Sequence, residues 1–449
     1  MVTVFDGCAV ATVDASGTEY ASGHVVVSDG VITAVGPGPF TGDGERVDAS
    51  GCLATPGLVN THHHLYQWAT RAVSVDDGLF EWLKTLYPIW AGISEETVGA
   101  AARAGLARLA LTGCTTSTDH HYVFPRSGGD VLGATIDAAA TVGLRFHPTR
   151  GSMDLSEKDG GLPPDSVVQS LDEILAAVAA AVHRWHDPSP GSMLRIAAAP
   201  CSPFSVTQDL MRQSAAQARE LDIRLHTHLA ETLDEDEFCK EKFGRTPVEY
   251  LEDVGWLGPD VWLAHGVHLS DADVGVLAAA GTGVAHCPSS NARLGSGIAP
   301  VAALVGADAP LGLGVDGAAS QEHGGMVDEL RQALFAARLR SGPSGLTSRQ
   351  ALRIATMGGA RCLGRQEEIG SLEVGKRADI ALWRVDGPFH ADIVDPVDAL
   401  VYAAPPPLVR LVVEGRTIVV DGALQTLDVE AAGRDLRDAA RTLAARASR

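Results

Sequence analysis

The residues with the clearest chemical potential are His62 and His64, which stand shortly after the turn residues Pro56 and Gly57. The short segment between the turn and the histidines is apolar, which favours a strand. Alternate residues of a strand point to the same face, so these two imidazoles should lie together while His63 points away. Two imidazoles on one face at a strand end form half of a metal site.

Polar residues of the same kinds follow three later apolar segments. They are His226, His228, Glu231, His265 and Asp316. Between the first two we prefer His228 as a metal ligand, because it lies nearer the strand end and three residues before Glu231. His226 lies on the same face of the expected strand and is the alternative.

Three imidazoles and one carboxylate suit a single divalent metal ion, zinc or alternatively iron. The expected ligands are His62, His64, His228 and Asp316. A second ion would need a bridging carboxylate or lysine, and none follows the apolar segment 195–199. Taken singly, each histidine can be an ordinary hydrogen-bonded residue and Glu231 a helix-start carboxylate. Four clusters at corresponding places in the pattern favour a shared site.

Such a site activates water, because a bound divalent ion lowers the pKa of water from 15.7 toward about 7. Asp316 can then accept a proton from the water, and His265 can polarise the reacting group or shuttle a proton. Glu231 can protonate a ring nitrogen and then assist the leaving amine. The expected reaction is attack on an amidine-like carbon, followed by loss of ammonia.

Eight apolar segments alternate with helical patterns through the middle of the chain. This order predicts an α/β fold with a (β/α)8 TIM-like barrel, whose chemistry lies at the carboxyl ends of the strands. A doubly wound open sheet is the alternative. The expected strands are residues 57–64, 115–119, 144–149, 195–199, 224–228, 261–265, 283–286 and 311–315.

Short strand patterns at both chain ends predict a smaller β-sandwich domain that the barrel interrupts. The turn signal Asp29-Gly30 separates two such strands near the amino terminus. We therefore expect residues 1–55 and 365–449 to form the sandwich, with a terminal amphipathic helix after residue 427. Residues 56–364 should form the barrel.

Local signals mark several helix ends and two long loops. Thr246 and Glu249 match a capping box, Ser270 a helix N-cap and Gly281 a helix stop. The connections over roughly residues 65–93 and 150–165 are long for a barrel and are expected to cover a substrate.

Composition narrows the partners of the chain. Its 449 residues are 45% hydrophobic and carry a formal net charge of −21. An acidic surface opposes binding to nucleic acid or to an anionic membrane. The seven cysteines are scattered, which favours reduced thiols and a cytoplasmic protein. No stretch of about 18 apolar residues predicts a membrane span.

The clusters resemble the motifs of the amidohydrolase superfamily, in particular its mononuclear aminohydrolase branch, which deaminates purines, pterins and triazines. The resembling segments are 56–64, 228–232, 264–268, 286–291, 314–317 and 369–380. The resemblance implies a barrel with a composite β-sandwich and supports the ligand set above. It also implies a small heterocyclic substrate and a homo-oligomer.

Four further segments most resemble the 8-oxoguanine deaminases within that branch. They are 152–154, 158–165, 201–205 and 291–297. The resemblance implies hydrolysis of an oxopurine, 8-oxoguanine, to urate and ammonia. Isoxanthopterin deaminases and s-triazine amino- or chlorohydrolases share these features and are alternatives. A non-catalytic scaffold of the same superfamily is the remote alternative, because such proteins commonly lack the metal ligands that this sequence contains.

Substrate contacts are expected from position. The carboxamide of Gln67, just past the first strand, can pair with a lactam edge. Trp82 in the first long loop can stack on a flat heterocycle. Cys201 follows the fourth strand and lacks a partner base, so we interpret it as pocket lining. His121 is expected to touch the substrate, although pocket and structural roles are both open for it and for His120.

Overall fold

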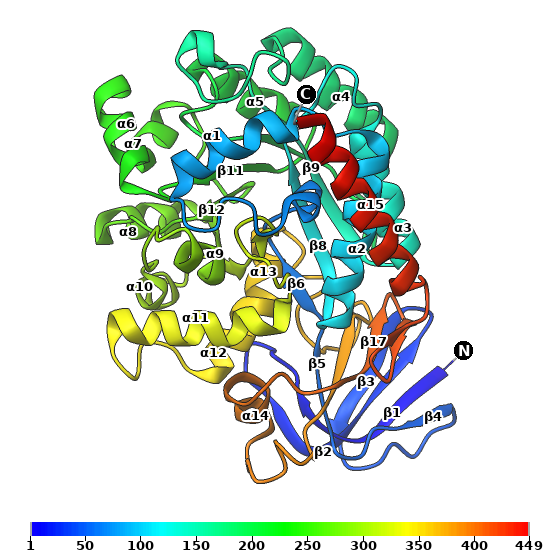
Figure 1. Ribbon diagram of the computed structural model, residues 1–449. Helices are drawn as coiled ribbons and strands as arrows, with labels where there is room; N and C mark the ends of the chain where they lie inside the picture. Colours follow the sequence, from blue (N-terminus) through cyan, green and yellow to red (C-terminus); the bar gives the residue numbers. More distant parts are fainter. Residues whose placement is uncertain (1, 448–449) are drawn as a thin grey trace.

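The computed structural model describes residues 2–447 and contains a closed barrel of eight parallel strands beside one nine-stranded sheet (Figure 1). Around the barrel the strands follow the order β10-β11-β12-β13-β14-β6-β8-β9. They are β6 (Leu58–Asn60), β8 (Cys114–His121), β9 (Arg145–Ser152), β10 (Ala197–Pro200), β11 (Leu225–Leu229), β12 (Val261–His265), β13 (Gly283–His286) and β14 (Leu311–Leu313). The predicted (β/α)8 barrel is confirmed, and each strand overlaps one predicted segment.

Both chain ends contribute to the nine-stranded sheet, as expected. Its strands are β1 (Val2–Ala11), β2 (Glu19–Ser28), β3 (Val31–Pro37), β4 (Glu45–Asp48), β5 (Cys52–Pro56), β16 (Ile380–Arg384), β17 (Leu408–Val413), β18 (Arg416–Val420) and β19 (Ala423–Leu424). Strand β5, which leads into the barrel, pairs antiparallel with β16, which follows the barrel in the sequence. Only Gly57 separates β5 from β6, and a Cβ there would lie 2.1 Å from the side chain of Thr115.

Helices surround the barrel. They are α1 (Leu79–Trp90), α2 (Glu95–Leu111), α3 (Val131–Val142), α4 (Leu171–Trp185), α5 (Gln208–Glu220), α6 (Leu233–Phe243), α7 (Pro247–Asp253), α8 (Asp271–Ala280), α9 (Pro288–Arg293), α10 (Val301–Gly306), α11 (Met326–Ser341), α12 (Ser348–Arg353), α13 (Gly359–Cys362), α14 (Pro396–Tyr402) and α15 (Val429–Ala447). Single short turns of other helix types cover Leu65–Thr70, Glu157–Asp159 and Ile354–Gly358. Across residues 2–447, no helix combines the length and apolar character that a membrane crossing requires.

The helix-end signals in the sequence are confirmed. Thr246 and Glu249 form a complete capping box at the start of α7. Ser270 caps α8, and Gly281 ends that helix in the left-handed conformation with φ of 71°. Side chains satisfy free backbone groups at the starts of α7 and α8, and the backbone N–H of Gly281 does so at the end of α8.

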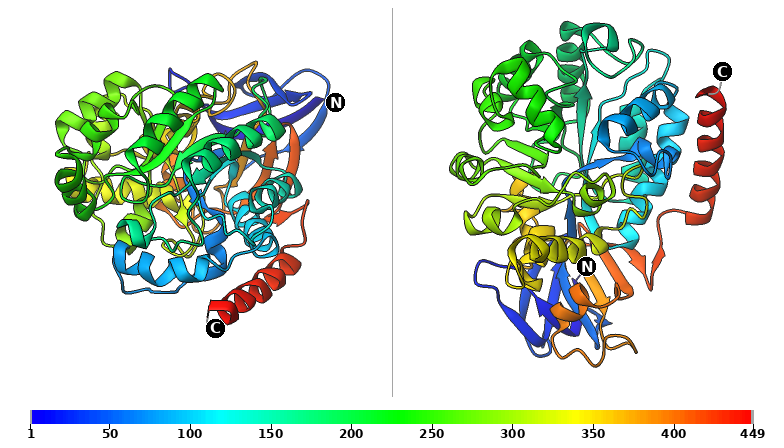
Figure 2. Two further views of the ribbon diagram at one scale, coloured as in Figure 1. Left: turned by 90° about the horizontal axis from the view of Figure 1, so that it is seen from above. Right: turned by 60° about the vertical axis from the view of Figure 1, so that its left-hand side comes forward.

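The terminal amphipathic helix is also confirmed, and the structure shows what it covers. Helix α15 leaves the sheet and lies along α2 on the outside of the barrel (Figures 1 and 2). Its buried residues Leu436 and Leu443 join an apolar cluster that includes Trp82 and Trp90 of α1. The end of the chain thus supports α1, which belongs to the first long connection of the barrel.

Candidate active site

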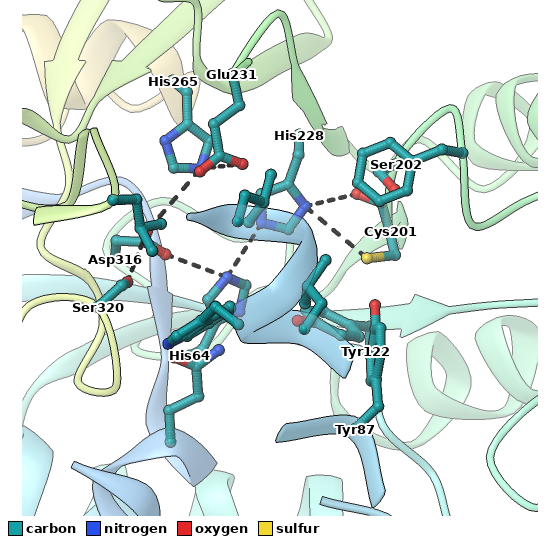
Figure 3. A pocket seen from close by; sticks show the side chains of 16 residues that line it. His64, Tyr87, Tyr122, Cys201, Ser202, His228, Glu231, His265, Asp316 and Ser320 are labelled. Carbon is teal, nitrogen blue, oxygen red and sulfur yellow. Dashed lines mark hydrogen bonds and ion pairs between the residues drawn. The ribbon is translucent and has the colours of Figure 1, made fainter. Parts of the chain in front are cut away.

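The carboxyl ends of the barrel strands bring the chemically capable residues to one buried point (Figure 3). His62 and His64 follow β6, and His228 lies in β11. The short strands β7 (His63–His64) and β15 (Asp316–Gly317) pair in parallel, which places Asp316 opposite His63. The side chain of His63 points away from this cluster, as predicted, because its Nδ1 donates to the Asp316 carbonyl and its Nε2 accepts from an indole.

Four ligand atoms come close together at this point. Asp316 Oδ1 lies 3.2 Å from His62 Nε2 and 3.3 Å from His64 Nε2. The Nε2 atoms of His64 and His228 are 3.1 Å apart. The structure therefore brings together the four residues that the sequence analysis expected to share one ion. His120 also lies among the three imidazoles, with possible ligand atoms within 4.8 Å.

Hydrogen bonds on the outer side fix the tautomers of two imidazoles. His64 Nδ1 donates to the carbonyl of His120 over 2.7 Å, and His228 Nδ1 donates to the carbonyl of Cys201 over 2.6 Å. Because a neutral imidazole carries one proton, the Nε2 atom of each ring presents a lone pair to the centre. Burial lowers the pKa of His228 well below its usual range, which keeps the ring neutral.

His226, the alternative ligand, stands behind His62 instead. Its Nδ1 donates to the carbonyl of Trp262 over 2.8 Å, so its Nε2 accepts from His62 Nδ1 at 2.8 Å. His62 Nε2 therefore also presents a lone pair inward, and that atom has no hydrogen-bond partner. Burial lowers the pKa of His62 well below its usual range.

This donor set fits a divalent cation. Three imidazole lone pairs and a carboxylate oxygen face one another without a proton between them, an arrangement that repels itself unless a positive charge is shared. Neutral imidazole nitrogens and a carboxylate are the ligands that zinc and iron accept. Hydrogen bonds behind the ligands orient the rings in the way that metal sites require.

Glu231 and His265 face the same point from the ends of β11 and β12. Glu231 Oε2 lies 3.5 Å from His265 Nε2, and His265 Nδ1 donates to Asn291 Oδ1 over 2.9 Å. Burial raises the pKa of Glu231 well above its usual range, and the negative charge of Asp316 adds to this effect. Both effects favour the protonated form of Glu231, the form in which a carboxyl group can donate a proton.

The backbone is strained where these side chains leave their strands. His265 has φ of 76°, Asp316 has φ of 60° and Ala230, which precedes Glu231, has φ of 52°. Residues other than glycine rarely adopt this region, which costs on the order of 1–3 kcal/mol for each. Such strain persists where neighbouring contacts fix the conformation, and here it coincides with the three segments that turn into the centre.

A cavity lies above this point. Its floor contains His64, His228, Glu231, His265 and Asp316, and apolar and aromatic side chains from α1 and neighbouring loops form its walls. Cavities that are lined mostly by apolar side chains, with a few polar groups, are typical of small-molecule sites. The lining favours one small ring compound.

Gln67 lies in the wall of this cavity with an unpaired carboxamide. Its exposed fraction is 1%, and neither Oε1 nor Nε2 has a hydrogen-bond partner. The amide lies against Gly317, where a Cβ would come within 1.7 Å of Oε1. Such a buried amide offers both a donor and an acceptor, and leaving both unpaired costs free energy.

The other expected substrate contacts divide into two groups. Trp82 and Cys201 line the cavity, and Trp82 Nε1 donates to the carbonyl of Ala319 over 3.1 Å. The structure does not bring His121 to the cavity, because its Nε2 donates to the carbonyl of Val123 over 2.9 Å. Strand β8 extends to His121, two residues further than predicted, and alternation then turns His120 inward and His121 outward.

Several lining residues were not expected from the sequence. They are Leu79, Leu83, Tyr87, Tyr122, Ser202, Phe204, Leu294 and Ser320. The first three repeat at helical spacing within the long connection 65–93, and that periodicity was the available signal. Ser290 and Asn291, which hold Asp316 and His265, lie within the segment 286–291 that carries part of the family resemblance.

Comparison with known proteins gives one family and consistent relatives. The amidohydrolase family model matches residues 53–418. An 8-oxoguanine deaminase from Pseudomonas aeruginosa is 49% identical over 416 residues, 92% of each chain. An isoxanthopterin deaminase from an unknown prokaryotic organism is 36% identical, over 88% of this chain and 87% of that protein.

A solved structure agrees with the fold. The atrazine chlorohydrolase TrzN from Arthrobacter aurescens TC1, complexed with zinc, superposes with a TM-score of 0.93 at 32% identity. The match covers 98% of this chain and 100% of that one. The chain therefore belongs to the amidohydrolase family and is a hydrolase.

Proposed function

We propose that the protein hydrolytically deaminates an oxopurine, converting 8-oxoguanine and water to urate and ammonia. The observation that carries the proposal is that the buried carboxyl group of Glu231 faces a set of four ligand atoms inside one cavity. The 49% identity to an 8-oxoguanine deaminase supports the choice of substrate.

The proposed metal ligands are His62, His64, His228 and Asp316, with zinc as the metal and iron as the alternative. The contacts of Asp316 Oδ1 with His62 and His64 at 3.2 and 3.3 Å, the 3.1 Å separation of His64 and His228 Nε2, and the inward lone pairs support this set. When bound, the ion lowers the pKa of a water molecule toward about 7 and so supplies the nucleophile near neutral pH.

In this proposal Asp316 accepts the proton of the water, and His265 assists it. Asp316 Oδ2 accepts hydrogen bonds from Ser290 Oγ at 2.6 Å and from Ser320 Oγ at 3.2 Å, which hold the carboxylate in place. His265 Nε2 lies 4.0 Å from Asp316 Oδ2 and 3.5 Å from Glu231. His265 therefore lies between the base and the acid, where it can polarise the carbon that is attacked.

Glu231 acts as the general acid. It protonates a ring nitrogen as water adds to the amidine-like carbon, and a proton then passes to the amine so that ammonia leaves. The water oxygen becomes the exocyclic oxygen of the ring carbon that loses its amine, and one ammonia departs, so the reaction needs no other reactant. Gln67 and Trp82 are proposed to hold the ring, the first by its unpaired carboxamide and the second by stacking.

The experiment is a substrate panel with the zinc-loaded protein. We expect ammonia and urate from 8-oxoguanine, and slower or no release from isoxanthopterin and an aminated s-triazine. If the protein turns over the pterin or the triazine but not 8-oxoguanine, the proposed substrate is wrong, while the proposed aminohydrolase chemistry stands. A zinc-loaded, folded protein that releases ammonia from none of the three would contradict the proposed function.

A further inference from the structure

The buried carboxylate of Glu235 makes contacts that the proposed chemistry does not use. Its exposed fraction is 0%, and it lies in the first turn of α6, four residues after Glu231. The Ala230 N–H donates to Oε1 over 2.9 Å, and the Glu231 N–H donates to Oε2 over 3.1 Å. Each carboxylate oxygen thus holds one amide of the strained segment that carries Glu231.

The usual explanation for this residue, a helix cap, does not apply. Thr232 and Glu235 match the spacing of a capping box, in which the glutamate would accept from the Thr232 N–H. No side-chain cap forms at α6, and Thr232 Oγ1 has no hydrogen-bond partner. Glu235 instead reaches past the cap position to the two preceding residues.

The same segment is held from its other side by the end of β12. The Ala230 carbonyl accepts from the Val267 N–H at 2.9 Å and from the His268 N–H at 3.0 Å. These residues follow His265 closely in the sequence. The Ala230–Glu231 peptide is therefore fixed between α6 and the segment that carries His265, which sets the 3.5 Å separation of the two side chains.

We propose that Glu235 is a positioning residue for catalysis, whose carboxylate holds the strained Ala230–Glu231 backbone so that Glu231 faces the reacting ring. The inference rests on the proposed role of Glu231 as the acid. A buried carboxylate is costly unless it is fully hydrogen bonded, so its retention at this place fits a geometric task. A displacement of about 1 Å in a reacting group can lower turnover about 100-fold.

The test compares Glu235→Gln with Glu237→Gln, a matched change at an exposed position of the same helix. The first substitution keeps the size of the side chain but turns an amide donor toward one of the two N–H groups. We expect kcat to fall about 10–100-fold with KM and zinc content within about threefold of wild type. Glu237→Gln should leave all three unchanged.

A double variant separates positioning from general structural damage. If Glu235 acts through Glu231, adding Glu235→Gln to Glu231→Gln lowers kcat no further. The inference would be overturned if the kcat losses of the two single variants multiply in the double variant. It would also be overturned if Glu235→Gln keeps kcat within twofold of wild type. Glu235→Asp retains the carboxyl group with a shorter reach, so it serves if the glutamine variant does not fold, and an intermediate loss of kcat is expected.

Amide hydrogen exchange tests the contact without any turnover. We expect the amides of Ala230 and Glu231 to exchange faster in Glu235→Gln than in Glu237→Gln, while the amides of the preceding strand β11 stay protected. Equal exchange of these two amides in both variants would contradict the positioning role of Glu235. This result does not depend on the substrate, so it distinguishes a failure of the inference from a failure of the proposed function.

Discussion

Burial raises the pKa of the Glu231 carboxyl group, and the negative charge of Asp316 adds to this effect, so the protonated form is favoured. Replacing Glu231 by glutamine preserves shape and hydrogen bonding but removes the proton that the leaving amine needs. We predict that Glu231→Gln retains zinc and fold while kcat falls about 10²–10⁴-fold. Steady-state kinetics with metal analysis would check this, and a near-wild-type kcat would remove Glu231 from the acid role.

Gln67 should contribute to substrate recognition but not to the stability of the fold. Both polar atoms of its carboxamide are buried without partners, which costs roughly 1–3 kcal/mol for each atom. We predict that Gln67→Met raises KM at least about 10-fold, since the ring loses two hydrogen bonds. The midpoint of thermal unfolding should stay equal or rise. An unchanged KM with a lower midpoint would indicate a structural role instead.

At the scale of elements, helix α1 forms a wall of the cavity and depends on α15 behind it. Leu443 of α15 is 1% exposed and shares an apolar cluster with Trp82 and Tyr87, which line the cavity. We predict that Leu443→Ala lowers stability by about 2–4 kcal/mol and raises KM more than it lowers kcat. Leu339→Ala is the control, because Leu339 is 81% exposed and the change should alter neither. Denaturant unfolding and kinetics provide the two readouts.

The pH dependence of stability has a source in helix α11. Burial raises the pKa of Glu329 from 4.5 to about 7, although Ser289 and Gln321 donate hydrogen bonds to its carboxylate. The folded state therefore favours the protonated form. This contribution to stability is fully present below the unfolded pKa and is lost as pH rises through the folded pKa.

We predict that the contribution of Glu329 to stability falls as pH rises from 4.5 to 7, the interval between its two pKa values. The midpoint of thermal unfolding of Glu329→Gln should therefore rise relative to that of the wild type as pH increases across this interval, because the amide does not titrate. Thermal unfolding of both proteins across that interval measures the difference. An equal slope in the variant would exclude Glu329 as the source.

At the scale of the molecule, the barrel and the clustering of ligands were predictable from the sequence for one physical reason. Parallel strands in a barrel end at the same rim, so polar residues that follow apolar segments must meet there. This logic placed His62, His228 and Asp316 together without any knowledge of distance. It also placed His63 outside the cluster, because alternation along a strand is strict.

The rest of the site depends on exact register and on packing between distant segments. The role of His121 depended on where β8 ends, since a strand two residues longer decides which of two neighbouring histidines faces inward. The contact of α15 with α1 joins the end of the chain to its first quarter, and an amphipathic pattern shows a buried face but not its partner. The expected homo-oligomer stays a prediction.

The most direct measurement of the whole proposal is a titration of metal-free protein with Zn²⁺ while ammonia release from 8-oxoguanine is followed. The metal-free protein should be inactive, and activity should rise linearly and stop rising at one equivalent of zinc, because His62, His64, His228 and Asp316 supply one ligand set. Ammonia release that persists without metal, or that needs two equivalents, would contradict the single-ion mechanism.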